Sequence, residues 1–553
     1  MSEKMMSNPW LARLFPLAVA LGWLADYLFW DKSVGISFPI FIALTLGLGF
    51  WLARQDEVAA HPRSLWLLVP IAFFALVSIL RAEQMTVILS RLLALFFMAL
   101  LAASFRGGRW PEYGLGDLID KLVTFVPKGL GRYRATRDET ESEQSGWRRA
   151  APVLRGLLLA APVLIVLGSL LSSADPFFGD WLEDLLSFLN IENLAEYLLR
   201  AGLILILANL LLGAYFYALQ ASRDESLVGE NKAILDPFLG FGESATILAS
   251  INLLFASFVA FQFQYLFGGE RNINFAGYTY AEYARRGFGE MVFVAFLVLL
   301  LFIVLSQVAK RESAGQRKAY SGLGIALFAL VAVILASAFQ RLLLYESAYG
   351  FSQIRVYSHV FMIWLGLLLA AIVVLEIRGN QRAFGLAMLG AVVGFVATLG
   401  VINVDGFIVH ANLERARLGA DMSINSSGPG GGRYEVDRDH VDLGYLGTLS
   451  SDAVPALAVE CERAEAEEDQ ALMTYAAVGL LCHAERSQSY PAPAHWQSWT
   501  LSSARARAAW QRLEDNQAFN SMDYDMRRNS QGQVLLSIAE SEFDCGHIGQ
   551  LRP

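Results

Sequence analysis

Long runs of apolar residues with almost no charge dominate residues 14–404. A helix needs about 20 apolar residues to cross the hydrocarbon core of a bilayer, which is about 30 Å thick. Buried helices of soluble proteins rarely stay apolar on every side for so long, and strands of a membrane barrel alternate residue by residue. The pattern predicts an all-α polytopic membrane protein. Its about eleven transmembrane helices are expected at 14–30, 33–53, 64–80, 85–105, 156–174, 201–222, 244–269, 291–308, 320–340, 356–375 and 383–404.

These spans divide the chain into four predicted parts. They are a four-helix transmembrane front (1–105), a basic cytoplasmic linker (106–155), a seven-helix transmembrane core (156–404) and an acidic, mostly helical soluble domain (405–553). The first run is not expected to be a cleaved signal peptide, because it continues through Asp31-Lys32 into the next span without a small-residue cleavage site.

Two connecting segments show amphipathic patterns. In the linker, Leu118, Ile119, Leu122 and Val123 form one apolar stripe, which predicts a short interfacial helix ending at Pro127, before a mobile polar stretch at 132–149. In the loop 175–200, the apolar face includes Trp181, Leu182, Leu185, Leu186 and Leu189. That loop is interpreted as an acidic helix resting on the outer interface, or alternatively as a cap packed on the ends of the spans.

The distribution of Lys and Arg among the loops predicts the orientation. If the N-terminus is cytoplasmic, the inner segments carry 22 basic residues and the short outer segments carry 8. Short cytoplasmic loops are enriched in Lys and Arg. We therefore expect a multi-pass protein of the bacterial cytoplasmic (inner) membrane, with a cytoplasmic N-terminus and an extracytoplasmic C-terminal domain.

The C-terminal part accounts for the whole net charge of −9, since its 22 acidic and 12 basic residues from Asp405 onward give it a net charge of −10 and leave the rest of the chain close to neutral. An acidic domain argues against nucleic acid as a partner. Apolar positions at helical spacing predict helices at 452–468, 469–485 and 499–515, with Ser450, Ser451 or Asp452 as N-caps. Only 532–538 shows the composition of a strand.

All three cysteines lie in this part. Cys461 and Cys482 flank a polar break between two predicted helices, so they are the preferred disulfide pair if the domain is extracytoplasmic. Three free buried thiols are the alternative. Because no CxxC motif or spaced histidine accompanies them, no metal site is expected.

The sequence lacks the usual enzyme signatures: the Walker A sequence, HExxH, GxSxG and HxH are absent. We therefore assign no catalytic residue and no cofactor. His359 and His410 lie near the predicted outer boundary, where each is either a pH switch or a structural residue.

Ionisable residues inside a membrane are costly and often functional. Asp26 and Arg91 lie within predicted spans, and the alternatives are pairing with other span residues or reaching to the interface. Two outer loops rich in Tyr, Arg and Glu are the other candidates for ligand binding. They contribute Tyr280, Glu282, Arg285, Arg286, Tyr349, Arg355 and Tyr357.

These loops carry several arginines on the side where basic residues are scarce, namely Arg285, Arg286, Arg341 and Arg355. Guanidinium groups suit phosphate or carboxylate, which predicts a pocket for an anionic small molecule or lipid headgroup. The alternatives are an i, i+4 pair between Glu282 and Arg286 and an interfacial belt of tyrosines.

The segments YTYAEYARRGFGE (278–290) and YESAYGFSQIRVY (345–357), with blocks at 403–405, 412–415, 442–446 and 449–455, resemble a bacterial family of polytopic membrane proteins. It is the domain-of-unknown-function family numbered four-one-seven-three, formerly grouped with four-one-five-three. The chain departs from the family pattern in an insertion at 420–440 and in Phe351-Ser352. The resemblance implies a cell-membrane protein without an assigned activity.

Three functions compete. The leading hypothesis is binding or transport of an anionic small molecule or lipid at the outer face. The second is an envelope sensor or scaffold, in which the C-terminal domain meets a protein partner. The third, a membrane enzyme using Asp26, Asp175, Glu282, Glu346 or Asp405 as acid or base, is least favoured because no spacing singles out a pair.

Overall fold

The computed structural model describes residues 9–140, 194–223, 238–266, 288–417, 443–487, 493–515, 522–529, 533–538 and 541–547, with isolated positions between 160 and 181 and at 227 and 519. The chain forms two compact units. The first comprises Met1–Val69, Phe96–Trp110 and Ile119–Glu225, and the second comprises Pro70–Leu95, Pro111–Leu118 and Ser226–Pro553.

Nine helices among the described residues are long and apolar enough to cross a membrane. They run Ser37–Gln55, Pro62–Leu80, Gln84–Ser104, Glu196–Ala221, Phe241–Gln262, Gly289–Val308, Ala314–Glu346, Gln353–Ile377 and Gln381–Ile402. Each coincides with one predicted span, so the chain is a predominantly helical polytopic protein. The predicted span 14–30 is the apolar part of helix α1 (Pro9–Phe29), and most of 156–174 lies outside the described residues. The total of eleven stays a prediction.

In the first unit, α1 packs along α9 (Leu194–Phe216) and also contacts α2 (Ser37–Gln55). Gly22 permits the close approach of α1 and α9, since a Cβ there would lie 2.6 Å from the carbonyl oxygen of Ile204. Small residues at such crossings are typical of membrane helices, whose association depends on backbone proximity.

The predicted interfacial helix is longer than expected. Helix α6 runs Leu115–Thr140, and Pro127 lies inside it. The prediction that the helix ends at Pro127 is therefore wrong, as is a mobile stretch beginning at residue 132, because residues 132–140 are helical. Proline rarely occurs inside a helix because it removes one backbone hydrogen bond, but a single lost bond did not end this one. The predicted helix in 175–200 lies largely outside the described residues.

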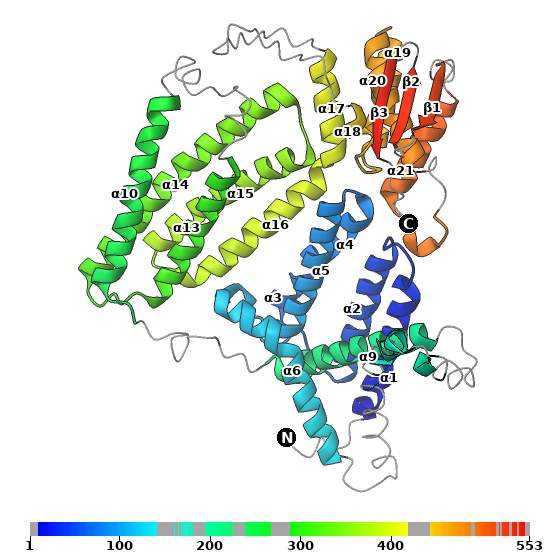
Figure 1. The fold of residues 1–553 in the computed structure, drawn as a ribbon. Helices are drawn as coiled ribbons and strands as arrows, with labels where there is room; N and C mark the ends of the chain where they lie inside the picture. The colour runs from blue at the N-terminus through cyan, green and yellow to red at the C-terminus, as the bar shows by residue number, and fades with distance from the viewer. Residues whose placement is uncertain are drawn as a thin grey trace. The chain divides into compact units, whose positions relative to one another are not determined.

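The second unit contains a bundle of long helices that lie side by side (Figure 1). They are α10 (Phe241–Leu266), α13 (Phe288–Val308), α14 (Ala314–Tyr349), α15 (Gln353–Ile377) and α16 (Phe384–Ile402), preceded in the chain by α4 (Leu68–Leu80) and α5 (Gln84–Ser104). Helix α14 contacts α10, α13 and α15, while α15 contacts α16. At that last contact the indole of Trp364 lies against Gly394, where a Cβ has no room, and donates to Thr398 Oγ1 at 3.0 Å.

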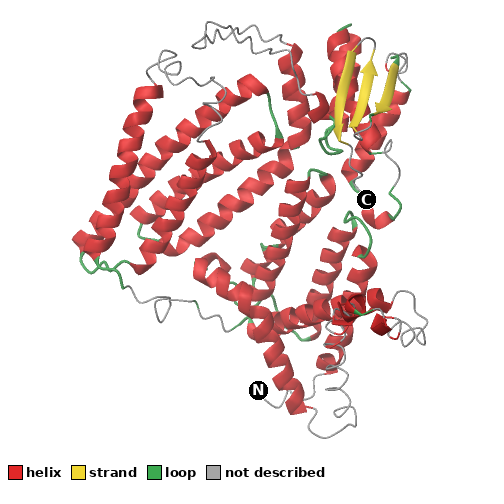
Figure 2. Ribbon diagram, viewed as in Figure 1, coloured by secondary structure: helices red, strands yellow, loops and turns green. Residues whose placement is uncertain are grey.

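The C-terminal part adds helices and a small sheet to the same unit. Its elements are α17 (Val404–Arg417), α18 (Leu443–Leu446), α19 (Val454–Ala466), α20 (Gln470–Arg486), α21 (Leu501–Glu514), β1 (Tyr524–Arg528), β2 (Gln533–Ile538) and β3 (Ser541–His547). The strands form one antiparallel sheet in the order β1-β2-β3 (Figure 2). The sequence predicted only β2. The polar, largely exposed β1 lacks the alternation by which a half-buried strand is recognised.

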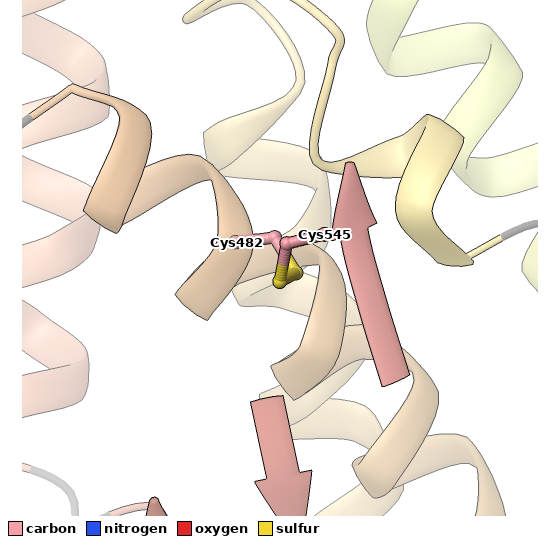
Figure 3. The surroundings of a disulfide bond; sticks show 2 residues. All are labelled: Cys482 and Cys545. Atoms are coloured by element: carbon pink, nitrogen blue, oxygen red, sulfur yellow. A yellow bond between two sulfur atoms is a disulfide. The ribbon is translucent and has the colours of Figure 1, made fainter. Parts of the chain in front are cut away.

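A disulfide joins Cys482 of α20 to Cys545 of β3, with a Cα–Cα distance of 5.3 Å (Figure 3). Cys461 is a free, buried thiol, whose pKa burial raises to about 12. The predicted pairing of Cys461 with Cys482 is therefore wrong. The sheet brings a distant strand, β3, against α20, and no local sequence pattern marks that strand.

Candidate functional site

The turn between α14 and α15 is held by a side chain of α17. Asn412 Oδ1 accepts from the backbone N–H of Phe351 at 2.7 Å, and Asn412 Nδ2 donates to the carbonyl of Phe351 at 2.9 Å. The preceding residue, Gly350, has φ 72° and ψ −171°, a conformation that is essentially restricted to glycine. A Cβ at Gly350 would also lie 2.6 Å from Asn412 Oδ1, so the absence of a side chain permits this contact.

Gln353, the first residue of α15, extends this attachment. Its Nε2 donates to Asp405 Oδ1 at 2.7 Å, and its backbone N–H donates to the Tyr445 hydroxyl at 2.8 Å. Asp405 Oδ2 accepts from the backbone N–H of Ser450 at 2.7 Å. Asp405 is fully buried, and desolvation raises its pKa although these hydrogen bonds favour the charged form.

A second turn, between α4 and α5, is bound by Asp452. Its Oδ2 accepts from the backbone N–H groups of Ala82 and Glu83 at 2.6 and 3.3 Å. Glu83 in turn caps the start of α5, because its two carboxylate oxygens accept from Met85 N and Thr86 N, each at 2.7 Å. Asp452 was one of three candidate N-caps for the predicted helix at 452–468, but its carboxylate accepts from the turn between α4 and α5 instead.

Arg81 attaches the same turn to the end of α16. Its Nε and Nη2 donate to the carbonyls of Gly400 and Val401 at 2.7 and 2.8 Å. A cation at a helix C-terminus is favoured by the unpaired carbonyls and the helix dipole. Burial lowers the pKa of Arg81, and nearby Asp452 offsets part of that shift.

We define the clamp as Asn403, Asp405, Asn412, Tyr445, Ser450 and Asp452. Asn403 completes it in the left-handed conformation (φ 55°) between α16 and α17, with Oδ1 accepting from Gly406 N and Nδ2 donating to the Asp452 carbonyl. The polar groups of the clamp are engaged with backbone and side chains, and the described residues contain no cluster suited to a metal ion. The arrangement therefore connects two interhelical turns to the C-terminal domain mechanically.

Tyr357, a predicted ligand residue, lies beside this site. Its hydroxyl faces the Glu83 carboxylate, but the contact falls short of the geometry of a good hydrogen bond.

Asp26, another predicted site residue, belongs to the first unit and is paired there. Arg200 of α9 donates Nη2 to Asp26 Oδ2 at 2.6 Å and Nε to Oδ1 at 3.1 Å, and the Asp26 side chain is only 7% exposed. Arg200 also contacts Glu196 at 3.5 Å and lies over the Trp30 ring. This geometry matches the alternative interpretation, in which Asp26 pairs with a residue of another helix.

The remaining residues predicted to bind a ligand lie in different environments. Arg355 donates to the carbonyls of Tyr349 and Gly350 and lies over the Tyr345 ring, so its guanidinium is used within the turn. Tyr349 is exposed at the end of α14, and Arg91 lies within α5. Tyr280, Glu282, Arg285 and Arg286 lie outside the described residues. The hypothesis that these side chains share one pocket stays a prediction.

The sequence singled out Asp405 and Asp452 only in other roles, and Asn412 only as part of a family block. The blocks at 403–405, 412–415, 442–446 and 449–455 contain the clamp residues, but their partners lie in turns far away along the chain. The Ala82–Asp452 contact joins residues 370 positions apart. Only a knowledge of tertiary structure connects them.

These features define a class: a polytopic membrane protein whose C-terminal part is attached to the turns between its spanning helices. Residues 18–459 match the family described as "Domain of unknown function (DUF4153)". The chain belongs to this family. No curated protein and no solved structure matches it.

Proposed function

We propose that this protein is a membrane sensor or scaffold that couples its C-terminal domain to the spanning helices. The clamp carries the proposal, because Asn412 and Asp452 bind the backbone of two turns that begin or end membrane helices, and Asp405 accepts from the side chain of Gln353 at the start of α15. A ligand or protein that shifts the C-terminal domain would move these turns with it.

The apolar core supports the same coupling. Buried residues of α15 and α16, Val356, Val360 and Leu399, belong to one cluster with Leu457 of α19 and Leu480 of α20. Packed interiors transmit displacement because they are dense and resist compression. Helix α14 is continuous for 36 residues, so a shift at its clamped end is carried along the bundle.

We further propose the finer topology: a bacterial inner-membrane protein of the subgroup numbered four-one-seven-three, with a cytoplasmic N-terminus and an extracytoplasmic C-terminal domain. Both clamped turns contact residues 403–452, so an even number of crossings must separate them. Five candidate spans are described between these turns, and the predicted span 156–174 would supply the sixth. The disulfide favours an oxidising, extracytoplasmic location.

Contacts at the end of the bundle opposite the clamped turns support the same membrane orientation. Leu239 pairs with Ala309, Arg311 donates to Gln381, and Gly385 lies against Leu115. These residues fall in or beside the segments predicted to be cytoplasmic. Labelling of a cysteine placed at exposed Trp496 by a membrane-impermeant maleimide in intact cells tests the orientation. Labelling only after permeabilisation would reverse it.

Site-specific photo-crosslinking in native membranes tests the coupling. A photoreactive residue at exposed Val459 of α19 is expected to capture a protein partner of the C-terminal domain. The same probe at exposed Arg134 of α6 is expected to give adducts that change when Asn412→Leu breaks the clamp. Asn412→Asp, which keeps one acceptor, is the milder control. No adduct at either position, or Arg134 adducts identical in both variants, would contradict the proposal.

Binding of an anionic molecule at the outer face is a second proposal, supported by the exposed Tyr349 beside the Tyr345–Arg355 stack. It depends on Arg285 and Arg286, since Arg355 is already engaged. Protection of arginines in 270–290 from a guanidinium-modifying reagent by vesicles of anionic lipid would support it. Equal modification in anionic and neutral vesicles would reject it.

A further inference from the structure

Two ionisable side chains meet at the clamped end of α14 and α15. Glu346 lies in the last turn of α14, and His359 lies in the second turn of α15. His359 Nδ1 is 3.0 Å from Glu346 Oε1, and their side chains are 15% and 3% exposed. The Phe339 ring packs edge-on against the imidazole, with centroids 4.7 Å apart. The pair is therefore held in place and largely shielded from solvent.

Three polar atoms of this pair are buried and lack a hydrogen-bond partner in the part of the chain that the structure describes. Among the described residues, neither carboxylate oxygen of Glu346 has a hydrogen bond of good geometry, and His359 Nε2 has none either. Glu376 offers a comparison, since it is as deeply buried at the other end of α15. It accepts from Ser321 Oγ at 2.7 Å and Gln381 Nε2 at 3.0 Å, and contacts Arg311 at 3.7 Å.

The two carboxylates therefore differ in how well their charge is compensated. A buried charge without donors is strongly unfavourable, whereas a paired and hydrogen-bonded one is tolerated. With a neutral imidazole, the Glu346–His359 pair carries one negative charge. One added proton, on either group, makes the pair neutral overall.

The charged groups on the surrounding elements do not compensate the negative charge of the pair. On α14, Arg341 donates to Gln262 of α10 at 3.3 Å, and on α15, Arg355 donates to backbone carbonyls of the turn. Arg415 of α17 lies near Gly350, while Glu83 and Asp405 lie around Tyr357. Helix α13 contributes only the exposed Glu290, and α16 contributes no charged residue.

We propose that Glu346 and His359 form a proton-binding site that takes up one proton, on either the carboxylate or the imidazole. Its position at the end of a span, one turn from the loop at 350–353, places it within reach of the aqueous phase. The inference is independent of the sensor function, because it concerns proton occupancy rather than a partner. Proton binding here also lies directly beside the clamped turn, since the Glu346 carbonyl accepts from Gly350 N at 2.8 Å.

Proton uptake by the full chain in lipid nanodiscs tests the site. Between about pH 8 and about pH 5, the wild-type protein is expected to bind about one proton more than Glu346→Gln, and the same excess over His359→Gln. The double variant should lose no more than either single variant, because the two groups titrate as a pair. Glu376→Gln is the matched control. Any proton loss that it causes should simply add to the loss caused by His359→Gln, because these two groups do not form a pair. Uptake that persists in Glu346→Gln, or additive losses, would overturn the proposal.

A second measurement avoids dependence on variant folding. In wild-type protein with isotope-labelled histidine, the His359 ring nitrogens are expected to change with pH together with the infrared carboxyl band of Glu346. A site that responds to sodium concentration at constant pH, or a His359 signal unchanged across this pH range, would overturn proton binding.

Discussion

The membrane bundle and the C-terminal domain lie in the same compact unit, yet they place apolar side chains in opposite positions. On α13, Phe293, Leu300 and Val304 are 59%, 47% and 50% exposed. On α20, Val478 and Leu480 are fully buried. Lipid accommodates exposed apolar side chains, whereas water does not, so the bundle depends on close helix approach and the domain on its own core. The same type of substitution should therefore have different effects in the two regions.

The largest effect is expected in the domain. Cys482→Ser removes a crosslink between residues 63 positions apart and should destabilise the domain by about 4 kcal/mol. Hydrogen exchange of peptides from 454–486 in the full-length protein, as urea increases, measures this loss. Cys461→Ala is the control, because this buried thiol forms no disulfide. Equal destabilisation by both variants would show that the disulfide adds nothing specific.

Acid should affect the domain through His483. Burial and, to a smaller extent, nearby Arg486 lower its pKa to about 4 from the ordinary 6.5. The unfolded chain therefore binds this proton more readily, and stability that is complete above 6.5 is lost as the pH falls towards 4. The loss amounts to about 3 kcal/mol.

The measurement is the pH dependence of exchange in 454–486. His483→Gln should flatten this dependence between about pH 6.5 and about pH 4, whereas His410→Gln, at an exposed position, should retain it. A wild-type domain with constant stability across that window would refute the role of His483.

At the boundary between the two regions, Asn412→Leu should cost about 2 kcal/mol, because the N–H and carbonyl of Phe351 lose their partners. The expected result is faster hydrogen exchange in 349–355, with little change in 454–486. Asn412→Asp should have a smaller effect, since it retains the acceptor. Unchanged exchange around Phe351 in the leucine variant would mean that the clamp does not restrain the turn.

Inside the bundle, Gly394→Ala should cost about 1 kcal/mol, because the added Cβ displaces the Trp364 ring. The change in thermal unfolding in nanodiscs measures it. Gly390→Ala on the same helix is the control, since nothing lies within 4 Å of a Cβ there. Equal shifts for the two glycines would contradict the packing described for α15 and α16.

The smallest effect is expected for Phe293→Ala on the lipid side of α13, below about 1 kcal/mol, because lipid replaces the lost contacts. Leu480→Ala in the domain should cost about 3 kcal/mol, since it leaves a cavity in a packed core. Thermal unfolding in the same nanodiscs compares the two. Similar losses would remove the distinction between the regions.

The sequence predicted these two regions unequally well. Nine spans coincide with helices, because apolar composition over about 20 residues is a strong local signal. The three predicted tail helices also coincide with α19, α20 and α21. Strands β1 and β3 were missed, and Cys482 was given the wrong partner as a consequence.

The clamp could not be predicted, since Asn412 and Asp452 have no local pattern that marks their partners. The Asp26–Arg200 pair was missed for the same reason: the two side chains lie in different helices, 174 positions apart.

The clamp also implies an order of assembly. Ala82, in the turn between α4 and α5, is synthesised 370 positions before Asp452, whose carboxylate accepts a hydrogen bond from its backbone N–H. Helices α4 and α5 must therefore enter the membrane and remain there with that turn incomplete. Contacts so distant along the chain form slowly, because a long loop must close first. The attachment of the C-terminal domain is thus a late maturation step, and a chain arrested before it would expose both turns.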